Sequence, residues 1–457
     1  MPRLALLRRL LVPAALAALS GLAAAGATTE FTLANGLKVV VREDHRAPVL
    51  AVQVWYRVGS GYEPDGKTGV SHALEHMMFK GTGRVPGGEF SRLVSVFGGT
   101  DNAFTTDDYT AYYQVYTADK LPLALELEAD RMQNLVLKPE DVVQELRVVM
   151  EERRLRTDDD PNALAGERFL ALAYLTSPSR VPTIGWMRDL ENLKLEDLKR
   201  WYETWYAPNN ATLVVAGDVD PAQVKAQVER FFGALPARPL PVVRPPRELP
   251  EPGERFMTLT LPAKVPALYL SYNVPSLNTG APGEAEALRL LAGVLDEGFS
   301  ARLETRLVRE QQVAAAIASG YDAFARGDSL FSLRAVPAPG RTLQELQAAI
   351  DAEIELLKTG PIAEDELKRV YAGLVSSDVF QRDSVMEQAT RIGALESVGQ
   401  SWRMVDTWPE SLRQVTTAQL QAAAVKYLVP ARRAVLHLVP GRLDTGDVAR
   451  VGKGDQK

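Results

Sequence analysis

The 457-residue sequence contains no cysteine and only four histidines. The absence of cysteine excludes disulfide bonds and thiolate ligands, so any metal site must use histidine and carboxylate side chains. Neither sign of charge is in large excess, and the formal net charge of −6 argues against nucleic acid as a partner. After the N-terminal stretch, no apolar run is long enough to span a bilayer. Hydrophobic content of 46% and charged content of 24% are typical of a globular protein.

The N-terminal residues have the pattern of a targeting segment. Three arginines within the first nine residues precede an apolar, alanine-rich stretch (10–25) that ends in Ala25-Gly26-Ala27. A basic start, an apolar middle and a small-residue cleavage site are typical of a signal peptide. An uncleaved membrane anchor is the alternative, which the proline, serine and glycine within the stretch disfavour. We expect a signal peptide at residues 1–27, a periplasmic or secreted protein, and no stable membrane span after cleavage.

The length of the chain predicts more than one domain. Seven prolines fall within residues 236–252, and such a stretch is typical of an extended, semi-rigid linker. We expect this linker to separate an N-terminal domain, residues 28–235, from a C-terminal domain, residues 253–457.

The two halves repeat one layout. A helical stretch at 198–206 precedes a short apolar strand at 211–216, and stretches at 418–427 and 434–438 have the same order. Each helix ends near a tyrosine and is followed by a proline, which favours internal duplication. We predict an α+β fold of two homologous domains, each a mainly antiparallel sheet with helices packed on one face.

Two of the four histidines stand four residues apart, in His72-Ala73-Leu74-Glu75-His76. Four residues is just over one helical turn, and the residues between them favour a helix, so both imidazoles would project from one face and could share a metal ion. The order His-x-x-Glu-His is the inverse of His-Glu-x-x-His and is a zinc-peptidase signature. Two core histidines spaced by chance are the alternative, and the motif is a hypothesis until its context supports it.

A catalytic zinc ion usually has three protein ligands, so the two histidines need a further partner. His45 and His437 lie near the ends of predicted strands, and we expect a carboxylate instead. A helix predicted at 139–156 carries five acidic residues before its last turn: Glu140, Asp141, Glu145, Glu151 and Glu152. Glu145 and Glu152 are two turns apart and share a face, whereas Glu151 points elsewhere. A solvated acidic face explains each of them equally well, so the residues alone leave the third ligand open.

The chain resembles the pitrilysin/insulinase family of zinc peptidases, and it is similar to the β subunit of the mitochondrial processing peptidase and its bacterial relatives. The resemblance covers nearly the whole mature chain. It rests on these stretches: the histidine motif with the preceding Gly69, Phe79-Lys80-Gly81-Thr82, Gly98-Gly99-x-x-Asn102-Ala103, and Val148-Val149-Met150-Glu151-Glu152.

The resemblance implies roles for individual residues. His72, His76 and Glu152 would hold one Zn²⁺ per chain, with Glu151 as the alternative ligand. Glu75 would be the general base, and Glu145 would orient a ligand or the water molecule. An edge strand would bind an extended peptide by adding it to the sheet, and the residues of that strand would be Asn102, Ala103, Phe104 and Thr105.

We therefore expect a zinc-dependent endopeptidase that cleaves short or unfolded peptides. Family members of this length resemble one half of a clam shell, which implies a second family-related subunit or a homodimer. A processing peptidase that removes targeting or leader segments is one alternative. A non-catalytic scaffold subunit is another, but such members have lost the histidine motif that is present here.

Overall fold

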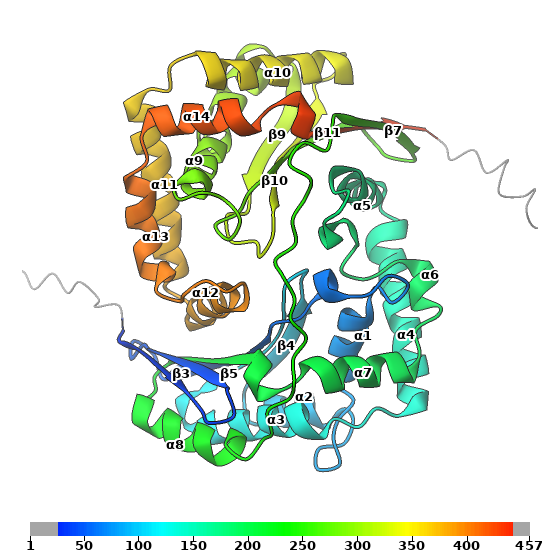
Figure 1. The fold of residues 1–457 in the computed structure, drawn as a ribbon, viewed down its shortest axis with the longest axis vertical. Helices are drawn as coiled ribbons and strands as arrows, with labels where there is room; N and C mark the ends of the chain where they lie inside the picture. The colour runs from blue at the N-terminus through cyan, green and yellow to red at the C-terminus, as the bar shows by residue number, and fades with distance from the viewer. Residues whose placement is uncertain (1–25, 442–457) are drawn as a thin grey trace, which may run out of the picture.

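The computed structural model describes residues 26–441, so the predicted signal peptide lies outside the described residues except for its last two positions. Within them the chain forms two β-sheets, one in each half, with helices around both (Figure 1). No helix in this part of the chain is long and apolar enough to cross a membrane.

The first sheet has six strands in the order β1-β2-β6-β3-β5-β4. Its strands have these bounds: β1 Thr28–Thr32, β2 Lys38–Glu43, β3 Val49–Tyr56, β4 Thr100–Thr105, β5 Thr110–Thr117 and β6 Ala211–Gly217. The central strands β3 and β6 are apolar along almost their whole length because helices cover both faces of the sheet there. Strand β4 lies at one end and pairs only with β5 within the described residues.

The second sheet has five strands in the order β7-β11-β8-β10-β9. Its strands have these bounds: β7 Arg255–Leu261, β8 Ala267–Val274, β9 Ala314–Tyr321, β10 Ser329–Pro337 and β11 Arg433–Pro440. Each sheet has one parallel pair, β2 with β6 in the first and β11 with β7 in the second, and its other pairs are antiparallel. In the first sheet, β1 adds an antiparallel pair outside β2. The predicted α+β fold with two similar, mainly antiparallel halves is confirmed.

The helices of each half pack on one face of that half's own sheet. In the N-terminal half the helices are α1 Val70–Met77, α2 Glu89–Val96, α3 Leu121–Asn134, α4 Pro139–Arg153, α5 Pro161–Ala173, α6 Met187–Leu190, α7 Leu195–Trp205 and α8 Pro221–Phe232. In the C-terminal half they are α9 Glu284–Asp296, α10 Leu343–Thr359, α11 Glu364–Gln381, α12 Val385–Ser397, α13 Met404–Arg413 and α14 Thr417–Tyr427. Helices α5 and α12 are the exceptions.

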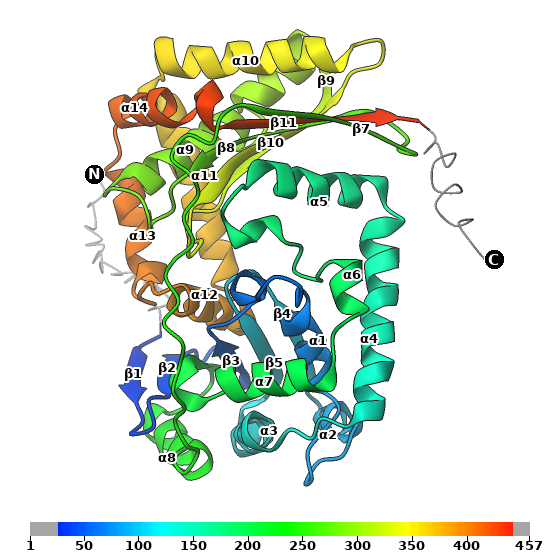
Figure 2. The same cartoon turned by 45° about the vertical axis from the view of Figure 1, so that its right-hand side comes forward.

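Each half covers the second face of the other half's sheet with one helix (Figure 2). Helix α12 lies on the first sheet, where Ile392 packs among Val40, Trp55 and Val214. A Cβ atom at Gly393 would lie 2.1 Å from the Trp55 ring, so only glycine allows this close approach. Helix α5 lies on the second sheet in the same way. The two halves are therefore joined by apolar packing as well as by the chain.

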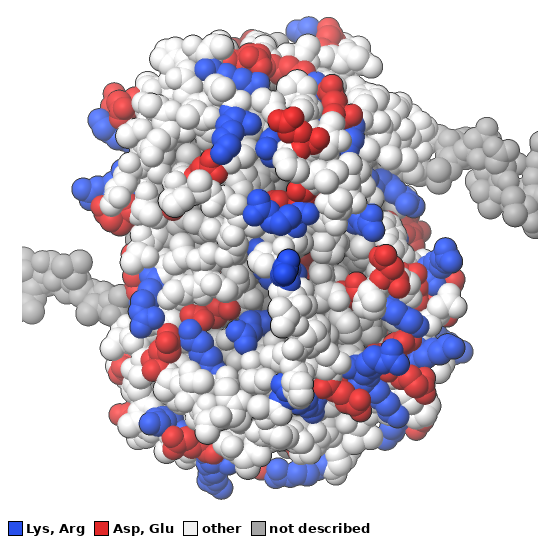
Figure 3. Space-filling model, viewed as in Figure 1, with Lys and Arg blue, Asp and Glu red and all other residues white. Residues whose placement is uncertain are grey.

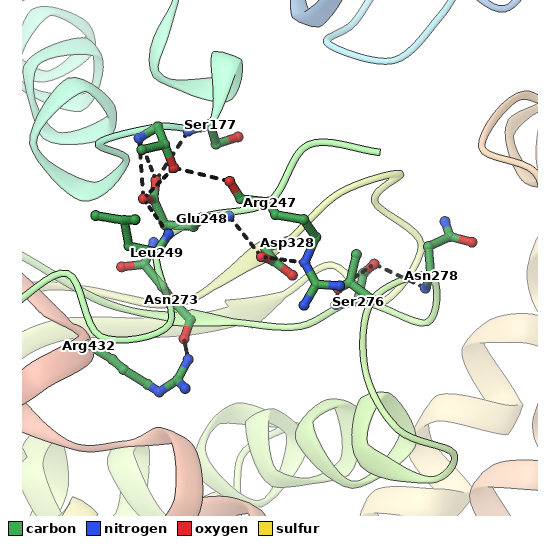
Figure 4. Close-up of polar contacts among 11 residues, drawn as sticks. Ser177, Arg247, Glu248, Leu249, Asn273, Ser276, Asn278, Asp328 and Arg432 are labelled. Atoms are coloured by element: carbon green, nitrogen blue, oxygen red, sulfur yellow. Dashed lines mark hydrogen bonds and ion pairs between the residues drawn. The ribbon is translucent and has the colours of Figure 1, made fainter. Parts of the chain in front are cut away.

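Residues 236–252 contain no helix or strand and run extended between the halves (Figure 1). The carboxylate of Glu248 accepts hydrogen bonds from the backbone N–H groups of Leu175, Thr176 and Ser177 in the N-terminal half. Figure 4 shows Glu248 beside Ser177. The carboxylate of Asp328 in the C-terminal half accepts bonds from the Glu248 N–H group and from Arg247. This stretch is thereby attached to both halves.

Candidate active site

Helix α1 begins where the chain makes a sharp turn. Gly69, its N-cap residue, has φ +86°, and a Cβ atom there would lie 2.6 Å from the carbonyl oxygen of Ile184. Glycine has no side chain to accept bonds from the first turn, and Glu63 does so instead. Its carboxylate accepts the N–H groups of Gly69 at 2.7 Å and Ser71 at 2.8 Å. Burial raises the pKa of Glu63 to about 8, and its two carboxyl oxygens still accept these N–H groups. Glu63 therefore fixes the start of the helix that carries both histidines.

Helices α1 and α4 bring His72, His76 and Glu152 together. Oε2 of Glu152 lies 3.4 Å from Nε2 of His76 and 3.8 Å from Nε2 of His72. The three potential ligand atoms lie within 4.8 Å of one another. Tetrahedral zinc with bonds near 2.1 Å places its ligand atoms roughly 3.4 Å apart. The donor set and its spacing therefore fit a zinc ion.

Charged neighbours hold two of these three side chains in place. Nδ1 of His76 lies 3.2 Å from Oε2 of Glu145, whose other oxygen forms an ion pair with Lys80 at 2.5 Å. Arg156 forms an ion pair with Oε1 of Glu152 at 2.6 Å, which leaves Oε2 facing the histidines. Arg156 lies in a π-helical turn, Arg154–Asp158, that extends α4. Such a turn changes the direction of its side chains and is frequent at functional sites.

The protonation state of His72 suits a ligand. Burial lowers the pKa of His72 to about 3, so its imidazole is neutral at pH 7. Its Nδ1 atom is buried and has no hydrogen-bond partner among the described residues. A neutral imidazole can offer Nε2 to a metal ion only when Nδ1 carries the proton.

Glu75 projects beside the three-residue cluster without belonging to it. Its Oε2 atom accepts a 2.5 Å hydrogen bond from the hydroxyl group of Thr105, at the end of β4. Burial raises the pKa of Glu75, and the Thr105 bond opposes that shift. A carboxylate with a raised pKa, held next to a metal site, is suited to accept a proton from water.

The alternative ligands lie elsewhere. Glu151 is largely exposed and pairs with Arg154 at 3.0 Å. His45 is exposed and pairs with Asp218 at 2.7 Å, whereas His437 is buried in β11 next to Gln347. None of the three belongs to the cluster of potential ligands found in the described residues.

The predicted substrate strand is β4, and its side chains differ in their surroundings. Phe104 packs edge-on against Trp55 with ring centres 5.4 Å apart, and Ala103 packs against the core on the α1 side. The Asn102 side chain is exposed, and its Oδ1 accepts the Ala103 N–H group. Among these four residues of β4, only Thr105 forms a side-chain hydrogen bond to Glu75, the residue beside the potential ligands. The sequence predicts Thr105 as part of the substrate strand, but no sequence pattern predicts its hydrogen bond to Glu75.

Two cavities meet along β4. One, of about 850 Å³, is lined by Glu75, His76, Phe79, Asn102 and Glu145 among others. The other, of about 1110 Å³, lies between the β4–β5 turn and strands β9 and β10 and includes Thr105. A peptide along the edge of β4 would pass from one cavity to the other.

On the face shown in Figure 3, basic and acidic side chains of the described residues are interspersed over both halves, without one large patch of either sign.

Comparison with known proteins decides the family. The family model described as Insulinase (Peptidase family M16) matches residues 38–184, and the model described as Peptidase M16 inactive domain matches residues 192–374. The zinc protease PqqE of Helicobacter pylori is 35% identical over 346 residues, which cover 74% of this chain and 76% of that protein. The chain belongs to the insulinase family, peptidase family M16.

Solved structures of this family agree with the fold. A protease from Helicobacter pylori superposes with a TM-score of 0.85 at 30% identity, over 91% of this chain and all of that one. The periplasmic protease PqqL of Escherichia coli superposes with a TM-score of 0.76 at 19% identity, over 93% of this chain and 50% of that one. The second similarity shows the fold alone, and the M16 chain described here spans half of PqqL.

Proposed function

We propose that this chain is a zinc-dependent endopeptidase. The observation that carries the proposal is the approach of His72, His76 and Glu152 to one point, with Glu75 beside them. Family membership and the zinc-protease names of the relatives support the same chemistry. One zinc ion per chain follows from one such cluster in the described residues.

The three ligand residues would hold Zn²⁺, which when bound supplies Lewis-acid activation of a water molecule and of the peptide carbonyl. Glu75 accepts a proton from the attacking water molecule and transfers it to the leaving nitrogen. Thr105 holds the Glu75 carboxylate in place. Glu145 orients the His76 ring through Nδ1, and Arg156 orients Glu152.

The proposed substrates are short or unfolded peptides. Strand β4 has a free edge within the described residues, and a peptide in extended form can pair with it through backbone hydrogen bonds. Asn102, Ala103, Phe104 and Thr105 would supply those backbone groups. Because such pairing depends little on side chains, we expect broad sequence preference.

The proposed location is the periplasm or the exterior of the cell, since residues 1–27 have the pattern of a signal peptide. The mature chain would then consist of the domains 28–235 and 253–457, joined by 236–252. Because PqqL is about twice as long as the region that it shares with this chain, a second family-related subunit or a second copy would complete the enclosure.

The test is to purify the protein, measure its metal content and assay peptide cleavage with and without a chelator. Wild type should contain about one zinc ion per chain, and the His72→Ala variant should lose both zinc and activity. Glu75→Gln should keep the zinc ion and lose most turnover, because an amide cannot accept the proton. Full zinc occupancy in His72→Ala would contradict the ligand set. Near wild-type cleavage by Glu75→Gln would contradict the role of the base, and an inactive wild type with bound zinc would indicate a scaffold subunit.

A further inference from the structure

Arg326 lies in the turn between β9 and β10 of the C-terminal half, yet its side chain contacts the N-terminal half and the extended stretch 236–252. Its backbone N–H group and its Nε atom each donate a 3.0 Å bond to the carboxylate of Asp108. One terminal nitrogen donates to the carbonyl oxygen of Arg244 at 3.2 Å. The guanidinium group lies 4.0 Å from the ring centre of Tyr62. Arg326 is only 6% exposed, so it is fixed between these partners.

The first partner, Asp108, belongs to the turn that joins β4 to β5. The loop before α1 also contacts this turn: the N–H groups of Ser60 and Gly61 donate to the carbonyl oxygens of Thr106 and Asp107 at 3.0 and 2.8 Å. A Cβ atom at Gly61 would lie 2.8 Å from the Asp107 carbonyl oxygen, so glycine permits this approach. The turn begins directly after Thr105, whose hydroxyl group bonds to Glu75. Arg326 therefore holds the turn that places Thr105.

The second partner, Tyr62, precedes Glu63 in the loop before α1. The Glu63 carboxylate accepts the first N–H groups of α1, the helix of His72 and His76. A guanidinium group stacked on a tyrosine ring is attracted to it and fills space beside it. Arg326 thus contacts both supports of the proposed site, one leading to the base and one to the start of the histidine helix.

A second ion pair that involves the β9–β10 turn does not reach these supports. Arg247, within the extended stretch 236–252, pairs with Asp328 of the C-terminal half at 3.2 Å (Figure 4). Asp328 lies two residues after Arg326 in sequence, but among the described residues no hydrogen bond or ion pair joins the Arg247–Asp328 pair to the loop 60–63 or to the turn 106–109. This pair supplies a matched control.

We propose that Arg326 is a positioning residue through which the C-terminal half orders the active site of the N-terminal half. The proposal rests on the peptidase function proposed above. It assigns to the C-terminal half, which contributes no residue to the cluster of potential ligands, a part in catalysis that apolar packing alone would not supply. The geometry of a reacting group matters because a misplacement of about 1 Å can cost on the order of 100-fold in rate.

The test compares wild type with the variants Arg326→Ala, Arg326→Lys and Arg247→Ala. Hydrogen–deuterium exchange should show faster exchange in residues 60–63, 69–71 and 106–109 for Arg326→Ala, with wild-type protection there for Arg247→Ala. With zinc bound, kcat of Arg326→Ala should fall on the order of 10- to 100-fold while KM changes little, because Glu75 is displaced and the strand edge is retained. Arg326→Lys keeps the charge but not the fork of donors, so it should recover part of kcat and serves if the alanine variant does not fold.

Wild-type exchange and wild-type kcat in Arg326→Ala would overturn the proposal. Equal losses in Arg326→Ala and Arg247→Ala would also overturn it, because both residues would then act only by joining the halves. A wild-type protein that binds zinc without cleaving peptides would contradict the proposed function instead. In that case the exchange comparison still decides whether Arg326 orders the two segments.

Discussion

The hydroxyl group of Thr105, the last residue of β4, donates a hydrogen bond to the carboxylate of Glu75 in α1. The strand proposed to bind the peptide and the residue proposed to activate water are thereby linked by one contact. The backbone of Thr105 is free to take part in strand pairing while its side chain holds the base. Peptide binding and the position of the base therefore depend on the same short segment.

Replacing Thr105 with valine removes this bond and keeps the side-chain shape. We expect Thr105→Val to bind zinc normally and to lose on the order of 10- to 100-fold in kcat, as when partners that orient a metal site are removed. Thr105→Ser retains the hydroxyl group and should keep most of the activity. Metal analysis and steady-state kinetics on one peptide measure both effects, and equal kcat values for the valine and serine variants would contradict this role.

The glutamates of α4 should differ strongly in their effects. Glu152→Gln should weaken zinc binding severely, because it replaces a charged ligand atom beside two histidines. Glu151→Gln should be nearly silent, since the Glu151 side chain is exposed and pairs with Arg154 rather than with a ligand residue. Glu145→Gln should fall between them, with a loss on the order of 10- to 100-fold in zinc affinity, because Glu145 contacts Nδ1 of His76 and orients that ring without being a ligand itself. Competition with a chromophoric chelator measures all three affinities, and a larger effect at Glu151 than at Glu152 would exchange their assignments.

The stability of the protein should depend on pH through Asp44. Bonds from Arg46 and from Gln388 of α12 lower the pKa of this carboxylate from 3.8 to about 2, with the Arg46 bond as the largest cause. Because the folded-state pKa is lower than the unfolded one, the stabilisation is complete above pH 4 and is lost as the pH falls toward 2. It amounts to about 2 kcal/mol, and the side chain is only 8% exposed, so solvent screens it little.

Urea unfolding of the chelator-treated protein tests this dependence. Asp44→Asn should be less stable than wild type at neutral pH, and the difference should be roughly halved at pH 3. Asp383→Asn is the control, because Asp383 pairs with the same Arg46 but is 74% exposed and should contribute little. An equal difference between wild type and Asp44→Asn at both pH values would contradict the lowered pKa.

Local sequence patterns were sufficient for much of the fold. The helix of His72 and His76 and the strand pair around β4 follow from short-range periodicity and turn residues. The helix at 139–156 was predicted in one piece, but its regular part ends at Arg153 and continues as a π-helical turn. No pattern in the sequence reveals this π-helical turn. The turn nevertheless directs the Arg156 side chain toward Glu152.

Contacts between distant segments could not be predicted. The apolar faces of α5 and α12 show that each helix is buried but not which sheet buries it, and each lies on the sheet of the opposite half. The bond between Arg326 and Asp108 joins residues 218 positions apart, and neither residue belongs to a recognisable motif. Such contacts arise from the packing of the two halves against each other. A single sequence contains no periodic pattern that indicates which distant segments will pack together.

The assembly of the active species is the final prediction. The described residues contain one candidate site, and β4 beside it lies at the end of its sheet with one edge open to a further strand. A second chain over this edge would enclose a bound peptide, and water exclusion and alignment of the substrate both favour enclosure. We expect a second family-related subunit without its own histidine motif to complete the site, with a homodimer as the alternative. Light scattering after size-exclusion chromatography, combined with assays at several dilutions, distinguishes them: a homodimer loses specific activity on dilution, whereas a chain that needs a different partner is weakly active until the partner is added. A strict monomer with full peptidase activity at every dilution would contradict both forms, because its 457 residues would then enclose the substrate alone.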